Sequence, residues 1–334
     1  MSKNTEQKPN ALLVIILAMI ILSHISLPLH AQTNELIRVE YNKDRLVKMA
    51  VIGYIAEARL GSPPYRVGAD GSIGIFPATG SITYNFRTGD SAVDLAGDHV
   101  EPAVTLFNPG PANDRRSGES RAFNVLSCIG NEVKVLSGEA RGATGVVIGK
   151  HGGSEHVMVD FKNPEVMKKM TPGDRMQVYA WGVGMELTNI NGVKAMNMSP
   201  QLMEALTNAG MGITPDGKLK IGVAVTIPAK IMGSGLGVDH VYSGDYDIQF
   251  FDKAVVEKYG LNKLRFGDIV AITDSDHSYG RIYKTGAITI GVVTHSGSVV
   301  AGHGPGVTTL FTSSEGNIEI VTDPKANLKY LLLE

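Results

Sequence analysis

Cysteine is almost absent from this chain, because Cys128 is the only one among 334 residues. A single cysteine cannot form an internal disulfide, so no disulfide framework holds the fold together. Leu126 and Ile129 lie close to it in the sequence, which favours burial over the exposed, electropositive setting of a nucleophilic thiol. We therefore expect Cys128 to be a core residue.

Familiar catalytic motifs and a strong charge are lacking as well. The chain contains no G-x-S-x-G turn, no G-x-x-x-x-G-K-S/T phosphate loop and no H-E-x-x-H helix. The formal net charge is only -2, without a basic stripe, which gives no support to nucleic-acid binding. These absences argue against several common enzyme classes and against a nucleic-acid partner.

Aromatic residues are scarce (6%), whereas glycine is abundant, with 39 residues. Many glycines among Val and Ile are typical of short strands joined by tight turns. Only two helices are predicted, over residues 199–207 and 252–259, with Ser199 and Asp252 as caps. Residues 108–120 are predicted to form a surface loop. The fold class is therefore predicted to be all-β or β-rich α+β, with small barrel-like units.

Strand-like patterns recur along the whole chain. They lie at residues 46–55, 81–86, 103–107, 175–180, 220–227, 269–273, 288–294, 298–301 and 307–312. The clearest unit, residues 132–161, resembles an SH3-like segment of the KOW type, which we interpret as structural. Loss of regular alternation near 184–210 predicts a boundary between an N-terminal domain, 32–190, and a C-terminal domain, 191–334.

The first 31 residues have the pattern of a signal peptide. Lys3 and Lys8 precede an apolar run at 11–22, and the small residue Ala31 precedes Gln32. We expect cleavage there and export to the periplasm or the medium. An uncleaved leader would instead anchor the protein in a membrane.

The run Gly-Asp-His-Val-Glu at 97–101 is a candidate site. On an extended chain His99 and Glu101 share a face, where they could bind one divalent metal or form a carboxylate–imidazole pair. The alternative is an exposed turn in which Asp98 caps backbone amides.

The run Asp-Ser-Asp-His at 274–277 is a second candidate. Asp276 and His277 could act in acid–base or metal chemistry, and Tyr279 and Arg281 follow within reach of a substrate. The downstream glycine and glutamate of a calcium-binding EF-hand are missing. The alternative is a charged β-turn.

A third candidate is the glycine-rich run at 302–306. Gly302 and Gly304 could turn backbone N–H groups toward a cavity, beside the imidazole of His303. The alternative is a tight hairpin. His295, on the preceding strand, is expected to be a packed residue, and His151 is expected to be mainly structural.

Asp245 and Asp247 alternate on one face and could hold a hard cation. The alternative for this pair is a solvated turn.

Seven runs together resemble the bacterial and archaeal domain-of-unknown-function family 4438, over about residues 46–313. They are residues 65–68 (with Arg66), 97–102, 128–132, 149–153, 243–247, 264–268 and 302–306. The family is uncharacterised, so the resemblance implies membership without implying an activity.

We predict an exported, metal-assisted hydrolase of a small polar amide or ester, with a divalent metal ion as cofactor. The predicted catalytic residues are Glu101, Asp276 and His303, and the predicted metal ligands are His99, Glu101, Asp276 and His277. The predicted substrate-binding residues are Arg66, Asp98, Asp245, Asp247, Tyr279, Arg281, Gly302 and Gly304. The alternatives are a non-catalytic protein that binds a small ligand or a cation, and a self-assembling structural protein. Homo-oligomers are compatible with each.

Overall fold

The computed structural model describes residues 35–60, 63–111 and 113–334. The predicted leader, 1–31, lies outside these residues. Residues 36–334 form one compact unit. Among the described residues, no helix combines the length and the apolar character needed to cross a bilayer.

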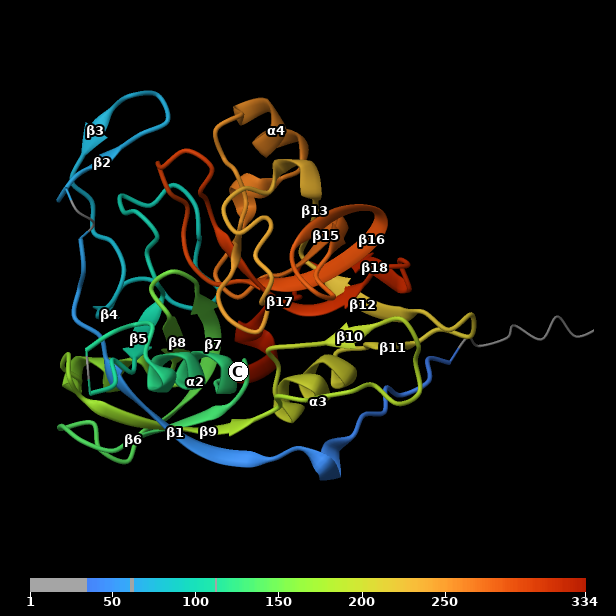
Figure 1. Ribbon diagram of the computed structural model, residues 1–334, viewed down its shortest axis with the longest axis horizontal. Helices are drawn as coiled ribbons and strands as arrows, with labels where there is room; N and C mark the ends of the chain where they lie inside the picture. Colours follow the sequence, from blue (N-terminus) through green and yellow to red (C-terminus); the bar gives the residue numbers. More distant parts are fainter. Residues whose placement is uncertain (1–34, 61–62, 112) are drawn as a thin grey trace, which may run out of the picture. The chain divides into compact units, whose positions relative to one another are not determined.

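Six antiparallel strands close a barrel in the order β1-β9-β6-β7-β8-β5, because β5 also pairs with β1 (Figure 1). A short strand, β4 (Ile82–Thr83), extends the sheet beyond β5. The barrel strands are β1 (Lys48–Ile55), β5 (Ala103–Phe107), β6 (Glu132–Val135), β7 (Thr144–His151), β8 (His156–Asp160) and β9 (Arg175–Trp181). The predicted β-rich, barrel-containing fold is thus confirmed, and residues 132–161 supply three of its strands.

A second sheet has the order β10-β17-β16-β15-β13, and β14 also pairs with β17. Its strands are β10 (Lys194–Ala195), β13 (Val225–Pro228), β14 (Tyr246–Asp247), β15 (Ile269–Asp276), β16 (Ile282–Val293) and β17 (Gly306–Ser313). Smaller sheets are made by β11 (Gly212–Ile213), β12 (Leu219–Val223) and β18 (Ile318–Thr322), and by β2 (Arg66–Val67) and β3 (Ile73–Gly74).

Three α-helices accompany the sheets in the described part of the chain: α2 (Gly118–Leu126), α3 (Pro200–Asn208) and α4 (Lys253–Lys258). Shorter 3-10 turns occupy Lys43–Arg45, Pro164–Lys169, Ala229–Ile231 and Leu261–Lys263, and Lys329–Leu333 is a π-helical turn. The predicted caps of α3 and α4 are confirmed, since Ser199 accepts from the Leu202 amide and Asp252 from the Ala254 amide.

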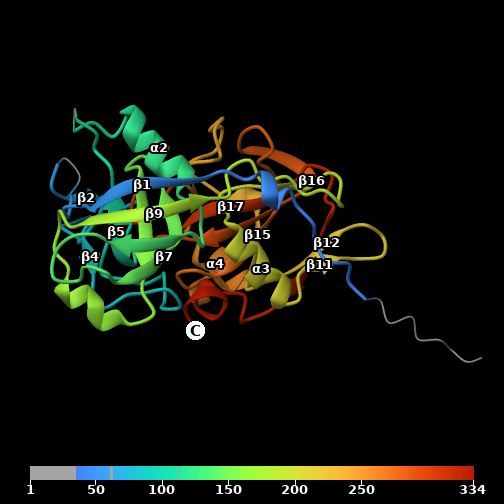
Figure 2. The same cartoon turned by 90° about the horizontal axis from the view of Figure 1, so that it is seen from below.

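Helix α2 corrects the prediction of a loop over 108–120. Ser117 caps the helix by accepting a hydrogen bond from the Ser120 amide. Figure 2 shows α2 lying beside β1. The Phe123 side chain of this helix belongs to the barrel core and is 1% exposed. Packing of this aromatic ring stabilises a helix that begins with glycine, a poor helix former.

The strand predicted at 298–301 is also wrong. The Asp98 carboxylate accepts hydrogen bonds from the Ser298 hydroxyl and the Val299 amide, which fixes a turn instead of a ladder. The strand predicted at 220–227 breaks at Ala224 into β12 and β13, and the one at 81–86 shortens to β4. Cys128 is fully buried as predicted, and burial raises the pKa of its thiol.

His277 lies in the interior of the second sheet. Its Nδ1 is 2.7 Å from the Thr309 hydroxyl and its Nε2 is 3.0 Å from the Ser275 hydroxyl. Burial, followed by the charge of Arg281, lowers the pKa of His277 to about 3. The folded protein therefore holds this imidazole neutral across the physiological range.

This burial predicts a loss of stability in acid. The unfolded chain takes up a proton at His277 near the ordinary pKa of 6.5, whereas the folded chain does so only near pH 3. The free energy of unfolding should therefore fall on acidification within this window, by on the order of 1 kcal/mol per pH unit. Urea unfolding of the wild type and of His277→Asn at several pH values measures this pH dependence of the free energy of unfolding. Equal pH slopes for the two proteins would contradict the assignment.

The packing of α2 on the barrel predicts that a single methyl group added at Gly53 destabilises the protein. A Cβ on Gly53 in β1 would lie 2.4 Å from Phe123 Cζ and 3.2 Å from Leu106 Cβ. Gly53→Ala should therefore lower the free energy of unfolding by about 1–3 kcal/mol through overpacking. Gly118→Ala, with open space around its Cβ, is the matched control and should not lower the free energy of unfolding. Denaturant unfolding of both variants measures the difference. Equal unfolding midpoints for Gly53→Ala and Gly118→Ala would contradict the contact between Gly53 and Phe123.

Candidate metal centre

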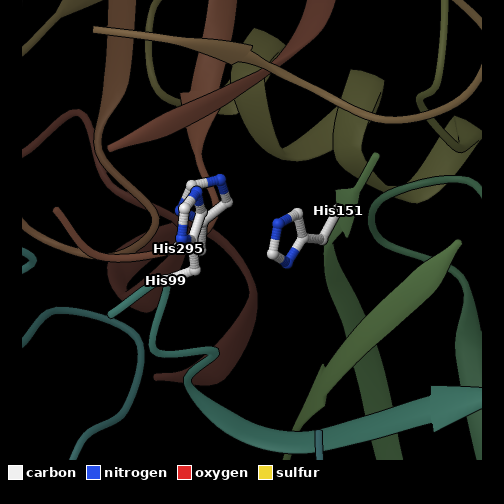
Figure 3. Close-up of side chains that lie close together, drawn as sticks. All are labelled: His99, His151 and His295. Carbon is white, nitrogen blue, oxygen red and sulfur yellow. The ribbon is translucent and has the colours of Figure 1, made fainter. Parts of the chain in front are cut away.

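Four histidines from three segments lie close together: His99, His151 and His303 line one cavity, and His295 is buried beside them. His151 is the last residue of β7, His295 follows β16, and His99 lies in the segment before β5. His303 lies in the connection between β16 and β17. Figure 3 shows the rings of His99 and His295 facing that of His151.

Backbone hydrogen bonds hold two of these segments together. The His99 amide donates to the Gly297 carbonyl at 3.2 Å, and the Ser296 amide donates to the Val100 carbonyl at 2.9 Å. His99 adopts a φ of 53°, an uncommon conformation for a residue other than glycine. The two segments therefore run side by side, which places His99 beside His295.

A glycine in β7 allows the close packing that brings His151 next to His295. A Cβ on Gly149 in β7 would lie 2.7 Å from Thr294 Cβ, so the glycine lets the barrel contact the end of β16. The ring centroids of His151 and His295 are 4.2 Å apart as a result. A Cβ on Gly306 would similarly lie 2.2 Å from His295 Nε2 and 2.3 Å from Asp245 Oδ2.

The imidazoles converge. The His99 ring centroid lies 5.5 Å from that of His151, 5.0 Å from that of His295 and 5.2 Å from that of His303. Three overlapping groups each have ligand atoms within 4.8 Å of one another: His99 with His151 and His295, His99 with Asp247 and His303, and Asp245 with Asp247 and His295.

Carboxylates orient two of the rings. His99 Nδ1 lies 3.1 Å from Asp98 Oδ2, and His151 Nδ1 lies 2.5 Å from Glu101 Oε1. An Nδ1–H bonded to a carboxylate leaves the Nε2 lone pair available, which is the usual outer-shell arrangement of a metal-bound histidine.

Backbone carbonyls orient the other two rings in the same sense. His295 Nδ1 lies 2.9 Å from the Ser296 carbonyl oxygen, and His303 Nδ1 lies 3.2 Å from that of Ala301. All four rings therefore have Nδ1 occupied, which leaves Nε2 of His99, His151 and His303 available as a ligand, whereas Nε2 of His295 lies 2.7 Å from Asp245 Oδ2.

Two aspartates complete the cluster. Asp245 Oδ1 accepts a hydrogen bond from the Gly152 amide at 3.0 Å, and Asp247 is 4% exposed. Asp245 Oδ2 lies 2.7 Å from His295 Nε2, yet the two atoms do not meet hydrogen-bond geometry and both are buried without a partner. The two atoms form an ion pair when His295 is protonated, and a metal ion that displaced this proton would have both atoms within reach.

The electrostatics also favour a cation. Burial would lower the pKa of His295, but the Asp245 and Asp247 carboxylates raise it well above its ordinary value. His295 therefore holds a proton in the metal-free protein, and a metal ion would have to displace this proton to bind Nε2. Burial lowers the pKa of His99 by more than the Asp98 carboxylate raises it, which favours the neutral ring that a metal requires.

Asp98 lies behind His99 and outside the cavity. Burial would raise its pKa, but hydrogen bonds from His99 and Ser298 hold the pKa well below its usual range. Asp98 also forms an ion pair with Arg66, whose Nε is 2.8 Å away. The carboxylate therefore stays ionised and positions the His99 ring.

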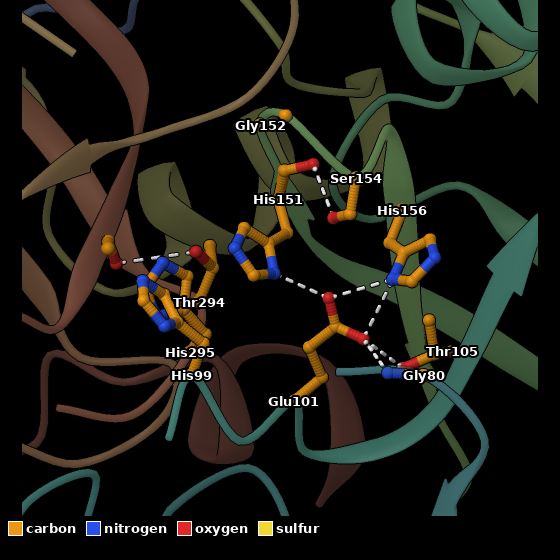
Figure 4. Close-up of polar contacts among 12 residues, drawn as sticks. Gly80, His99, Glu101, Thr105, His151, Gly152, Ser154, His156, Thr294 and His295 are labelled. Atoms are coloured by element: carbon orange, nitrogen blue, oxygen red, sulfur yellow. Dashed lines mark hydrogen bonds and ion pairs between the residues drawn. The ribbon is translucent and has the colours of Figure 1, made fainter. Parts of the chain in front are cut away.

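Glu101 lies between His151 and His156 and contacts both rings, as Figure 4 shows. Its oxygens accept from the Gly80 amide and the Thr105 hydroxyl, both at 2.8 Å, and contact the rings of His151 and His156. Burial would raise the pKa of Glu101, but these imidazoles hold it well below the ordinary value. With both oxygens occupied, Glu101 can orient His151 and is not available as a ligand.

The second predicted run lies apart from the cluster. Asp276 Oδ1 accepts from the Ser278 amide, and His277 is enclosed by hydroxyl groups. Tyr279 is 87% exposed, with Lys194 Nζ 3.5 Å from its ring centroid. These three residues belong to none of the ligand groups and do not line the cavity, whereas Arg281 does.

Gly302 and Gly304 shape the segment around His303. The Gly302 carbonyl accepts from the Ser234 amide at 2.7 Å, and a Cβ on Gly304 would lie 1.6 Å from the Ile248 carbonyl oxygen. The glycines therefore allow the chain to pass close to its neighbours and, unlike His303, do not line the cavity.

The sequence analysis did not place His151 and His295 among the candidate ligands. Each directly follows a strand pattern, and His151 precedes two glycines, a signal compatible with a site at a strand end. The cavity that these residues border has a volume of about 560 Å³. It is lined by Arg59, Arg66, Arg115, Arg281, His99, His151, His240, His303, Glu155, Asp245 and Asp247, with smaller residues between them.

The comparisons with known proteins give a family and a fold. The chain is similar to the crystal structure of a protein designated TM1086, with 45% identity and a TM-score of 0.80, over 88% of this chain and 99% of that one. No curated protein matches it. Two family models match, "Domain of unknown function (DUF4438), N-terminal" at residues 65–204 and the corresponding C-terminal domain at 209–332. Since these matches cover most of the chain, the protein belongs to the DUF4438 family.

Proposed function

We propose that the protein is a metal-dependent hydrolase that acts on a small amide or ester. One observation carries the proposal: His99, His151, His303, Asp245 and Asp247 line one cavity, and the buried His295 lies within reach of the same ligand groups. Imidazole and carboxylate ligands suit a first-row divalent metal such as zinc. The predicted leader would place this activity outside the cytoplasm.

His99, His151 and His295 would hold the metal, with Asp245 beside them. A metal bound there would polarise a substrate carbonyl and lower the pKa of a water molecule to about 7. His303 lines the cavity and offers Nε2, so it can accept a proton from an attacking water molecule. Asp98 and Glu101 would keep the ligand rings in place during the reaction.

A non-catalytic cation-binding protein is the second candidate, and the number of ligands favours it. Six side chains offer ligand atoms within the overlapping groups. If His303 and Asp247 both bind the ion, the coordination is closed and no position remains for a substrate, as in structural metal sites.

Metal content tests the site itself. The purified protein should contain about one transition-metal ion per chain, and His99→Ala or His295→Ala should reduce this several-fold, because each removes one ligand. Elemental analysis by mass spectrometry measures it. His240→Ala is the matched control, since His240 lines the cavity but belongs to none of the ligand groups. A metal-free wild type, after reconstitution with Zn²⁺, Mn²⁺ and Fe²⁺, would refute the proposal.

His303 separates the two candidates. If it is a general base, His303→Asn should keep the metal and lower kcat on a panel of amide and ester substrates by about 10²–10⁴-fold. If it is a fourth imidazole ligand, the same variant should lose metal. Retained metal with no turnover by the wild type of any substrate would favour the binding protein.

A further inference from the structure

The cavity next to the ligand cluster has cationic walls. Its lining includes four arginines, and the acidic residues among the described lining are Glu155, Asp245 and Asp247. A metal ion bound by the two aspartates would compensate their charge. The remaining wall would then attract the anionic part of a ligand.

Three of the arginines already have partners. Arg66 Nε forms an ion pair with Asp98 at 2.8 Å, and Arg115 donates to the Gly153 carbonyl. The Arg59 guanidinium lies 5.4 Å from the Phe107 ring centroid. Arg59 is exposed, so water can satisfy its donors, whereas Arg281 is the fully buried guanidinium of the lining.

Arg281 is 2% exposed, although it lines the cavity. Its Nε has no hydrogen-bond partner, and its Nη2 reaches the Ser243 carbonyl only at 3.5 Å. Arg281 forms no ion pair within 4.0 Å among the described residues, although the Asp245 and Asp247 carboxylates lie close enough to raise its pKa against the larger, opposite effect of burial. A buried cation with unsatisfied donors is costly unless a ligand supplies the acceptors.

The backbone holds Arg281 in a defined position. Its amide donates to the Val238 carbonyl and its carbonyl accepts from the Gly237 amide, both at 2.9 Å. The guanidinium carbon lies 5.9 Å from the ring centroid of Tyr246, the residue between the two aspartates. The donors are thus preorganised beside the ligand cluster.

We propose that Arg281 binds an oxyanion group of the substrate, a carboxylate or a phosphate. Both groups offer two oxygens to the planar guanidinium fork, which makes such pairs strong and oriented. Built on the proposed function, this inference narrows the substrate to a small anionic amide or ester. The acidic group would lie at Arg281 and the scissile bond at the ligand cluster.

Binding of two probes, succinate and inorganic phosphate, tests the inference. Isothermal titration calorimetry on the metal-loaded full-length protein should detect at least one of them. Arg281→Gln should weaken that binding at least about tenfold and leave the metal content unchanged. Arg141→Gln is the matched control, because Arg141 is exposed and outside the cavity lining, and it should change neither quantity.

Several outcomes would overturn the inference. These are no binding of either probe to the wild type, or wild-type affinity in Arg281→Gln. Loss of binding in His99→Ala but not in Arg281→Gln would show that the anion binds the metal instead. If circular dichroism shows that Arg281→Gln is unfolded, Arg281→Lys decides by the same criterion, since it keeps the charge without the fork.

The two proposals can fail separately. A wild type that binds no metal but binds a probe through Arg281 would refute the hydrolase and support the anion site. A wild type that holds metal, but whose affinity for the probe is independent of Arg281, would refute the anion site and support the hydrolase.

Discussion

Gly149 lets strand β7 of the barrel lie directly against Thr294 at the end of β16. Any larger residue would separate the two sheets there, because its Cβ would overlap the threonine side chain. His151 lies two residues after the glycine and His295 one residue after the threonine, so this contact sets the 4.2 Å between their rings. The cluster therefore depends on the packing of the barrel against the second sheet.

Buried carboxylates orient the imidazole rings of His99 and His151. Asp98 and Glu101 are buried carboxylates that would be costly without partners, and hydrogen bonds from His99, His151 and their neighbours offset the cost. The same bonds select which imidazole nitrogen faces the cavity. The hydrogen bonds of Asp98 and Glu101 therefore both stabilise the fold and orient the imidazoles.

The fold was largely predictable from local signals. The capping residues Ser199 and Asp252 predicted the starts of two helices. The glycines and alternating valines of residues 132–161 predicted barrel strands. Helix α2 was not predictable, because its start at Gly118 has low helix propensity and its stability comes from a distant contact of Phe123. Tertiary packing overrides local preference at such positions.

The site was predictable only in part. Polar residues on tight loops singled out His99, His303, Asp245 and Asp247, which do meet. The same reasoning failed to separate these from Asp276 and His277, because the pairing of the strands decides which loop faces the cavity. His151 and His295 were missed since a histidine at a strand end looks the same whether it packs or binds.

The six candidate ligand residues are spread from position 99 to position 303 of a 334-residue chain. Nearly the entire polypeptide must therefore be synthesised and folded before they can meet. A cation would then be acquired late, and its identity would reflect the ions present wherever folding is completed rather than those at the ribosome.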